Sequence, residues 1–493
     1  MATTVIVVTI LSCIERALGF GYRIFLSRTI GSEGLGLYQI ALSVIGVLIT
    51  FSASGIPITV SRLMIKERAH NQTNAENKAV SAGIVTALAT SLFLCAFFFI
   101  FKNLLNVIFA DSRCNVLFLI ILPGVVLTSV YAVIRGFFWG TKSFYTYSII
   151  ELLEEVIMII CGVWLVLKGE SIFQKAIYAS VAVLLSYVFS FTLSTAVFIA
   201  KGGRVLNPKN YLKPLITSSA PITFMKTANS FTASLIAIVF PLVLISTGLD
   251  KQTAISEFGI ISGMALPLLF IPSTLIGSLS LVISPQLAEN FYKKRVNKIK
   301  TDVEKSLLYS LLISVLIIPA FAGVGEYLGK FLYDNSLAGV YIRNSAFIMI
   351  PMSISIISTS LLNSMGFEKN TLKYFIIGSL SLIASILIFP KYIGNYALVI
   401  GYFASYAISS ILNVIKLIKV CKQKLTFKKY FLKSIPTCLA LCFLNYFLFK
   451  LGANFFHPFI SMILSCLITL IVNVLCLLAL GLINPKLFKK SAV

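Results

Sequence analysis

The sequence predicts an all-α polytopic membrane protein of about fourteen transmembrane helices, with two six-helix lobes around a central cavity and two additional C-terminal helices. Composition is the first reason: 58% of the 493 residues are hydrophobic and 12% are charged, whereas soluble domains carry roughly 25% charged residues. Second, the apolar residues gather in runs of roughly 20, the length at which a helix crosses ~30 Å of hydrocarbon. Third, Lys and Arg concentrate in every second connection between these runs.

Six predicted spans form the N-terminal lobe, six form the C-terminal lobe, and two end the chain. In order, they cover about residues 4–26, 35–60, 79–101, 115–138, 144–167, 176–199, 215–246, 256–286, 306–328, 344–365, 371–390, 394–416, 434–450 and 458–482.

The distribution of basic residues predicts the orientation, because short cytoplasmic loops hold an excess of Lys and Arg. With the N-terminus inside, the inner connections contain 28 of the 41 Lys and Arg residues and the outer connections contain 10. We therefore expect both termini in the cytoplasm. The formal charge of +24 then faces anionic lipid headgroups and does not indicate nucleic acid as a partner. The densest basic patch, 416–433, fits lipid contact, with a soluble partner as the alternative.

The two longest inner connections divide the chain into three predicted parts. These are an N-terminal lobe (1–200), a C-terminal lobe (201–420) and two further helices (421–493). Arg16 and Lys226 each lie in the first helix of a lobe. Weak internal symmetry of this kind is typical of secondary transporters, whose site lies between the repeats near the membrane midplane.

Proline interrupts the long seventh and eighth spans. Pro221 and Pro241 lie in the seventh, and Pro267, Pro272 and Pro285 lie in the eighth. Proline removes a backbone donor and kinks a helix, and membrane helices tolerate such breaks where neighbours or cavity water satisfy the freed carbonyls. A static kink and a moving, cavity-lining helix both remain open.

The first span, within "SCIERALGFGYRIFLSR" (12–28), contains Glu15, Arg16 and Arg23. On a helix, Arg16, Gly19 and Arg23 share one face, whereas Glu15 points about 100° away from Arg16. Charged residues in mid-membrane cost about 2.5–3.5 kcal/mol each on insertion scales. This helix is therefore expected to line a protein-lined or aqueous interior, although Arg23 lies near enough to the outer end to reach the interface.

The fifth span contains the other charged cluster. In "IIELLEEVIMI" (149–159), Glu151, Glu154 and Glu155 form one acidic face, and like charges so close must be protonated or paired with cations. The candidate cations inside the membrane are Arg16, Arg23 and Lys226. One interpretation is a structural set of ion pairs. The other is that these groups contact substrate and exchange partners during transport.

No catalytic motif is present. The chain lacks a phosphate-binding P-loop, a Ser/His/Asp grouping and any metal-ligand spacing, and its only two histidines, His70 and His457, lie in predicted loops. The nine cysteines lie mostly inside apolar runs and contain no CxxC pair, so they are expected to be small buried residues. The sequence thus predicts no enzyme activity, no metal site and no cofactor.

Four stretches resemble the stage V sporulation protein B family of polysaccharide exporters and flippases, which are related to the lipid II flippase and, more distantly, to multidrug and toxin extrusion antiporters. These stretches are "ERALGFGYRIFLSRTIGSEGLGLYQI" (15–40), "SASGIPITVSRLM" (52–64), "IRGFFWGTKSF" (134–144) and "GMALPLLFIPSTLIGSLSLVISPQLAE" (263–289).

The resemblance implies a membrane flippase that translocates an undecaprenyl-pyrophosphate-linked oligosaccharide by alternating access, for peptidoglycan, polysaccharide or spore cell-wall synthesis. It implies that Arg16, Arg23 and Arg62 bind the substrate. From its position inside the seventh span, Lys226 is expected to bind substrate as well, and Glu15, Glu151, Glu154 and Glu155 are expected to serve in coupling or ion pairs. Enzymes of cell-envelope or spore-cortex synthesis are implied as partners. Glu154 fits the glutamate of the family's E-Q-x-x-R pattern, although Glu155 and Met158 stand where Gln and Arg are usual.

Two other functions are compatible with these residues. A cation-coupled multidrug or metabolite antiporter of the same superfamily would use the acidic face of the fifth span to bind protons or Na⁺. A non-transporting scaffold in envelope or spore-coat assembly would leave the interior charges without a purpose.

Overall fold

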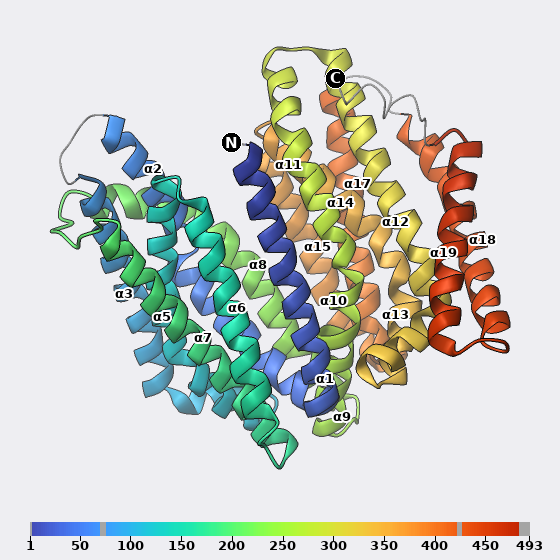
Figure 1. Cartoon of the computed structure of the whole chain (residues 1–493), viewed down its shortest axis with the longest axis horizontal. Coiled ribbons are helices and arrows are strands. Elements are labelled where there is room, and N and C mark those ends of the chain that lie inside the picture. The colour runs from blue at the N-terminus through green and yellow to red at the C-terminus, as the bar shows by residue number, and fades with distance from the viewer. Residues whose placement is uncertain (1, 70–74, 422–425, 483–493) are drawn as a thin grey trace. The chain divides into compact units, whose positions relative to one another are not determined.

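The computed structural model describes residues 2–69, 75–421 and 426–482, and every regular element in these ranges is a helix (Figure 1). The prediction of an all-α polytopic membrane protein is therefore confirmed. The chain divides into two compact units, Met1–Gly263 (unit 1) and Met264–Val493 (unit 2). Unit 1 extends past the lobe boundary expected at residue 200, and the division into three parts at 1–200, 201–420 and 421–493 stays a prediction.

Unit 1 is a helical bundle in which four later helices pack against α1. α5, α6, α7 and α8 all pack against α1. Its helices are α1 (Ala2–Ala53), α2 (Ile56–Ala69), α3 (Ala75–Ile100), η1 (Lys102–Leu104), α4 (Leu105–Ile108), α5 (Arg113–Gly140), α6 (Phe144–Val166), α7 (Ile172–Ala200), α8 (Leu212–Ser246), α9 (Lys251–Phe258) and most of the π-helix η2 (Gly259–Ala265).

Two short irregularities divide the first 69 residues into separate helical segments. Gly31 has φ 65°, a conformation that glycine adopts without a steric penalty, and it kinks α1 between the two spans expected there. A second break, at Ser54 and Gly55, separates α1 from α2. Pro57, at the start of α2, has no N–H to continue the helical bonding across this break. The second predicted span therefore consists of two pieces.

Unit 2 contains the remaining helices. These are α10 (Leu266–Leu269), α11 (Ile271–Tyr292), α12 (Val296–Tyr333), α13 (Ser336–Ser345), η3 (Ala346–Ile348), α14 (Met349–Ser364), α15 (Glu368–Ile388), α16 (Pro390–Ile393), α17 (Tyr396–Cys421), α18 (Phe427–Gly452) and α19 (Pro458–Ala479).

The prolines affect the seventh and eighth predicted spans differently. α8 runs without interruption through Pro221 and Pro241. The eighth span is divided near Pro267 and Pro272 into α9, the π-helix, α10 and α11, and it forms a bent helix pair. Of these two spans, only the eighth is broken.

The last two helices belong to unit 2 because they pack on α12. Asn473 of α19 donates a hydrogen bond to the Val315 carbonyl at 2.9 Å. A Cβ at Gly323 would lie 2.6 Å from the Asn445 side chain of α18, so glycine permits this close approach. Polar side chains of α18 and α19 therefore contact α12, although these two helices are otherwise strongly apolar.

Eleven helices of the described residues are long and apolar enough to cross a membrane, or twelve if the bent pair forms one span. With the bent pair counted as one span, two further features account for the difference between these twelve spans and the fourteen expected. Ile10–Glu67 counts as one 58-residue segment, although at about 1.5 Å per residue it measures roughly 87 Å, more than twice the hydrocarbon thickness. α6 is not counted because its three glutamates make it too highly charged.

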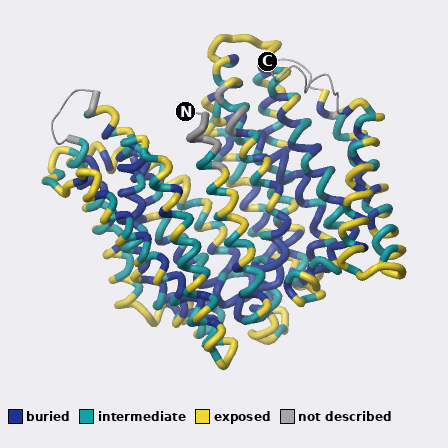
Figure 2. The backbone as a smooth tube through the Cα atoms, in the orientation of Figure 1, coloured by how far each residue is buried: buried dark blue, intermediate teal, exposed yellow. Residues whose placement is uncertain are grey.

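Exposed positions recur along the helices (Figure 2), and many of them are large hydrophobic residues. Phe99, Trp164, Phe443 and Leu475 are between 59% and 75% exposed. In water such surfaces would be unfavourable, whereas hydrocarbon solvates them. The arrangement fits helices that face lipid.

Candidate functional site

Unit 1 contains a partly open cavity of about 430 Å³, lined by charged and apolar side chains, among α1, α5, α6, α7 and α8. Four carboxylates and two cations meet in it. The charged residues that line the cavity are Glu15, Glu151, Glu154, Glu155, Arg135 and Lys226. Charged side chains within membrane helices are costly and usually mark a substrate or ion pathway, so this cavity is the candidate functional site.

Glu151 of α6 forms an ion pair with Arg135 of α5. The Glu151 Oε1 atom lies 3.0 Å from the Arg135 Nη1 atom, and the two side chains are 20% and 30% exposed. The Arg135 guanidinium also lies 5.4 Å from the centre of the Trp139 ring, a cation–π arrangement. The sequence interpretation offered Glu151 only the cations of the first and seventh spans, and this was wrong. Arg135 was counted with the inner connection that follows the fourth predicted span (115–138), but it lies inside α5, which continues to Gly140.

The other two glutamates of α6 have different neighbours. Glu154 lies within hydrogen-bonding reach of Ser190 on α7. Glu155 approaches α1 so closely that a Cβ at Gly19 would lie 2.7 Å from its Oε1 atom, and it interacts electrostatically with Arg23. The acidic face of α6 therefore contacts three helices and not lipid.

The side of α1 that faces α6 carries Glu15, Gly19 and Arg23, at i, i+4 and i+8. Gly19 and Arg23 share a face as expected. Arg16 is exposed and does not line the cavity, whereas Glu15 does. The missing side chain at Gly19 leaves room for the Glu155 carboxylate against α1. Glu15 lies one turn earlier on the same side, and Arg16, the next residue, points about 100° away from it.

Lys226 lines the cavity from α8 and contacts the break between α1 and α2. Its ammonium donates a hydrogen bond to the Ser54 carbonyl at 3.1 Å, and the Gly55 N–H donates to the Thr223 hydroxyl at 3.1 Å. A Cβ at Gly55 would lie 2.5 Å from that hydroxyl. The broken second span is thus held against α8 by polar groups that satisfy its irregular backbone.

Arg62 lies on α2, where it is exposed, and it is not part of the cavity lining. Of the four cations expected to bind substrate, the structure brings only Lys226 into the cavity itself.

Among the lining residues that were not predicted are Arg135 and Tyr131 of α5 and Tyr187 of α7. The aromatic residues after Arg135, in "RGFFWG" (135–140), are the sequence signal that the helix continues beyond the arginine. Tyr131 is one turn before Arg135 on the same helix face. Tyr187 carries no sequence signal that distinguishes it from other aromatic residues of its span.

No group of three or more His, Cys, Asp or Glu side chains in the described part of the chain is arranged to hold a metal ion. The four cavity carboxylates come from α1 and α6 only, and one of them is already paired with an arginine.

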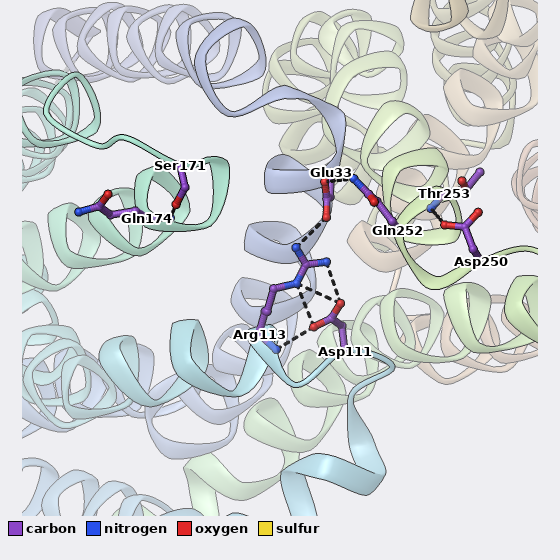
Figure 3. A network of polar contacts seen from close by, with 8 residues as sticks. All are labelled: Glu33, Asp111, Arg113, Ser171, Gln174, Asp250, Gln252 and Thr253. Carbon is purple, nitrogen blue, oxygen red and sulfur yellow. Dashed lines mark hydrogen bonds and ion pairs between the residues drawn. The ribbon is translucent and has the colours of Figure 1, made fainter.

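A second polar cluster ties α1, α5 and α9 together within unit 1 (Figure 3). The Arg113 guanidinium contacts Glu33 at 2.7 Å and Asp111 at 2.8 Å, and Gln252 donates to Glu33 at 2.7 Å. Close by, the Asp250 carboxylate accepts from the Thr253 N–H at 3.0 Å and caps α9. The cluster joins the start of α5 and the start of α9 to the region just after the Gly31 kink.

The pKa of Asp111 reflects this cluster. Burial raises the pKa of the Asp111 carboxyl, but hydrogen bonds from the Arg113 side chain and backbone and the Arg113 charge outweigh burial, so the pKa lies below its usual value. Asp250 is exposed, and hydrogen bonds from Thr253 hold its pKa below the usual value as well. Both carboxylates are therefore ionised at neutral pH.

Solved membrane transporters share this fold. The lipid II flippase MurJ in an inward closed conformation aligns over 95% of this chain and 98% of that chain, with a TM-score of 0.70 and 17% identity. An inward-facing multidrug resistance MATE family transporter aligns over 83% of this chain and 96% of that chain, with a TM-score of 0.69 and 13% identity. At these identities the likeness concerns the fold alone.

Sequence comparison gives the relationship. The chain is 27% identical to stage V sporulation protein B of Bacillus subtilis (strain 168) over 345 residues, which are 67% of this chain. The match spans 66% of that relative, just under two thirds of its length. The model of a family described as "Polysaccharide biosynthesis protein" matches residues 1–291, which is more than half of the sequence. The chain therefore belongs to the polysaccharide biosynthesis protein family.

Proposed function

We propose that the chain is a flippase that moves an undecaprenyl-pyrophosphate-linked oligosaccharide, a peptidoglycan or polysaccharide precursor, across the bacterial plasma membrane by alternating access. The observation that carries the proposal is the charged cavity of about 430 Å³ inside a bundle of membrane-length helices. A lipid-linked glycan has a polar head that must cross hydrocarbon, and a cavity with hydrogen-bonding and charged walls shields that head from lipid.

Family membership and the names of relatives support the same activity. The chain belongs to the polysaccharide biosynthesis protein family, and its relatives include stage V sporulation protein B and the lipid II flippase MurJ of Bacillus subtilis (strain 168). These names favour a lipid-linked precursor of the cell wall or the spore cortex as cargo. Enzymes of cell-envelope or spore-cortex synthesis are then the partners that supply and use this cargo.

In this proposal the cations bind the cargo and the carboxylates respond to it. Arg16, Arg23, Arg62 and Lys226 contact the diphosphate along its path, because guanidinium and ammonium groups form strong charge-assisted bonds with phosphate oxygens. Glu15, Glu151, Glu154 and Glu155 hold the cations when cargo is absent or bind a coupling ion. The chain carries out transport and no covalent chemistry, and it needs no cofactor.

Reconstitution tests the proposal directly. Purified protein in phosphatidylcholine vesicles is supplied with a fluorescent undecaprenyl-diphosphate disaccharide, and a membrane-impermeant quencher reports how much probe has reached the outer leaflet. We expect probe to cross faster with the protein than in empty vesicles. Equal rates in both kinds of vesicle, together with failure to complement a flippase-deficient strain at normal abundance, would contradict the proposal.

A second candidate function is a cation-coupled antiporter of drugs or metabolites. The four carboxylates of the cavity favour it, because they could bind protons or Na⁺. Efflux of a cationic dye driven by an imposed Na⁺ or proton gradient, with no transfer of the lipid-linked probe, would establish this function instead.

A further inference from the structure

The cavity contains hydrogen-bond donors for which unit 1 supplies no acceptor. The buried Nε atom of Arg135 has no hydrogen-bond partner among the described residues. The Tyr131 hydroxyl, on a side chain that is 4% exposed, has none either. Both residues belong to α5 and both line the cavity. A buried donor without an acceptor costs free energy, so each such group in a cavity is a candidate contact for a ligand.

Lys226 adds a cation with spare donors. An ammonium carries three N–H bonds, and one of those on Lys226 is directed at the Ser54 carbonyl. Lys226 and Arg135 are also close enough for their charges to interact. Two positive charges that face one cavity repel each other, and an anion placed between them removes that repulsion.

Each carboxylate of the cavity has a charged or hydrogen-bonding neighbour, and Glu15 interacts with the charges of Arg16 and Arg135. Glu151 has its ion pair with Arg135, Glu154 has Ser190, and Glu155 has Arg23 nearby. A ligand that satisfies the remaining groups must therefore provide acceptors and negative charge. Because Glu151 already occupies part of the Arg135 guanidinium, an anionic ligand has to compete with it.

We propose that Arg135, Tyr131 and Lys226 form an anion-binding subsite for the diphosphate of the cargo, and that the diphosphate replaces Glu151 as the partner of Arg135. This inference rests on the flippase function proposed above and names the groups that bind the phosphate within it. Arg135 supplies a planar fork suited to two phosphate oxygens, Tyr131 donates one hydrogen bond, and Lys226 neutralises the second phosphate. Glu151 holds Arg135 in place until the diphosphate arrives.

The test measures binding of farnesyl diphosphate, a short soluble stand-in for the cargo, to protein in phosphatidylcholine nanodiscs, with farnesol as the uncharged control. Glu151→Gln removes the competing charge but keeps the side-chain shape. We expect it to bind farnesyl diphosphate about tenfold more tightly than the native protein, which corresponds to about 1.4 kcal/mol. Farnesol binding should not change.

The donors are tested by two further variants. Tyr131→Phe removes one hydroxyl and should weaken farnesyl diphosphate binding without altering farnesol binding. Arg135→Gln alone leaves Glu151 without its cation and risks misfolding, so it is combined with Glu151→Gln to give a neutral pair of similar shape. This double variant should fold normally and lose the preference for diphosphate over farnesol.

Glu326→Gln is the matched control, because Glu326 pairs with Arg343 in unit 2 at 2.5 Å and lies outside the cavity. It should bind both probes as the native protein does. The subsite is overturned if Glu151→Gln leaves affinity unchanged, or if the double variant still prefers the diphosphate. Transfer of the lipid-linked probe by vesicles of the double variant at the native rate would overturn the subsite while leaving the flippase function intact. Diphosphate binding that needs these residues, in a protein that transfers no probe, would support the subsite and contradict the flippase function.

Discussion

Glu15 and Arg16 are neighbours in the sequence but lie in different surroundings. Glu15 lines the cavity of unit 1, whereas the Arg16 side chain is exposed. An exposed arginine near the middle of a membrane-length helix contributes little to packing within unit 1. Because its charge is costly during membrane insertion, we expect Arg16 to have a role other than packing within unit 1.

We expect Arg16→Ala to impair transport more than folding. The change leaves a strong helix former and removes a charge that opposes insertion, so membrane abundance should be normal. If Arg16 binds the cargo diphosphate, the loss is about 1.5–3 kcal/mol of a charge-assisted bond. Complementation of a flippase-deficient strain, with abundance measured in parallel, checks this. Normal complementation by Arg16→Ala would remove Arg16 from the site.

Arg16→Lys should restore transport only in part. An ammonium keeps the charge but lacks the planar fork that binds two phosphate oxygens at once. The same complementation assay gives the ranking, with the native protein above Arg16→Lys and Arg16→Lys above Arg16→Ala. Equal activity of the lysine variant and the native protein would indicate that the charge alone is needed.

Asp111 makes a pH-dependent contribution to stability. Its folded pKa lies below its unfolded value because of Arg113, and the unfolded value is about 3.9. The ionised carboxylate therefore stabilises the fold fully above that pH, and this contribution is lost as the pH falls through the folded pKa. Asp111→Asn should lower the free energy of unfolding at pH 7 by about 1 kcal/mol.

Thermal unfolding in detergent, recorded from pH 7 down to about 3, checks the sign of this effect. The difference between Asp111→Asn and the native protein should shrink once the pH drops below about 3.9. A difference that grows on acidification would mean that the Arg113 cluster does not hold Asp111 ionised.

At the scale of helices, glycine decides how closely α2 and α5 approach. A Cβ at Gly136 would lie 2.7 Å from the Pro57 carbonyl oxygen and 2.8 Å from the Pro57 Cα atom. Both are backbone atoms that cannot rotate away. The first turn of α2, which follows the helix break, therefore packs directly against the α5 backbone one residue after Arg135.

Gly136→Ala should destabilise unit 1 by about 1–3 kcal/mol, the usual cost of overpacking a close contact. Gly46→Ala is the matched control, because a Cβ at Gly46 meets nothing within 4 Å and alanine is the better helix former. Unfolding midpoints of both variants, measured in the same detergent, give the comparison. A Gly136→Ala midpoint as high as that of Gly46→Ala would show that the two helices do not pack this closely.

The sequence was informative about helices and less so about their breaks and neighbours. Hydrophobic runs locate most helices because lipid requires about 20 apolar residues for each crossing. The acidic face of α6 was also predictable, because helical periodicity alone puts Glu151, Glu154 and Glu155 together. The partner of Glu151 was not, since pairing depends on how α5 and α6 pack in three dimensions. For the same reason, the local sequence predicted neither the break at Gly55 nor the contact of Lys226 with Ser54.

At the scale of the whole molecule, the polar contacts between connecting loops agree with the predicted topology. In unit 1, Lys201 donates to the Ser143 hydroxyl at 3.0 Å, and the Arg204 N–H donates to Asn77 at 3.2 Å. All four residues belong to connections expected inside. Glu33, Arg113 and Gln252, from three connections expected outside, meet in the other cluster.

Unit 2 follows the same rule. Asn290 donates to Asp302 at 2.8 Å, and the Thr426 N–H donates to Glu304 at 2.6 Å, all from connections expected inside. Helices that cross a membrane alternately bring every second connection to one side, so a single missed crossing would have mixed the two groups.

We therefore expect both termini in the cytoplasm, and single cysteines provide the check. Cysteines introduced at Lys209 and Lys298, which are exposed, should react with a membrane-impermeant maleimide only after cells are opened. Cysteines at Glu170 and Asn454, also exposed, should react in intact cells.

The native chain, with nine cysteines of its own, gives the background that must be subtracted at each site. Because each unit contributes one inner and one outer position, an error in one unit would reverse two of the four sites. Reversal at all four would place the termini outside. The basic loops would then lie outside the cell, contrary to the positive-inside rule.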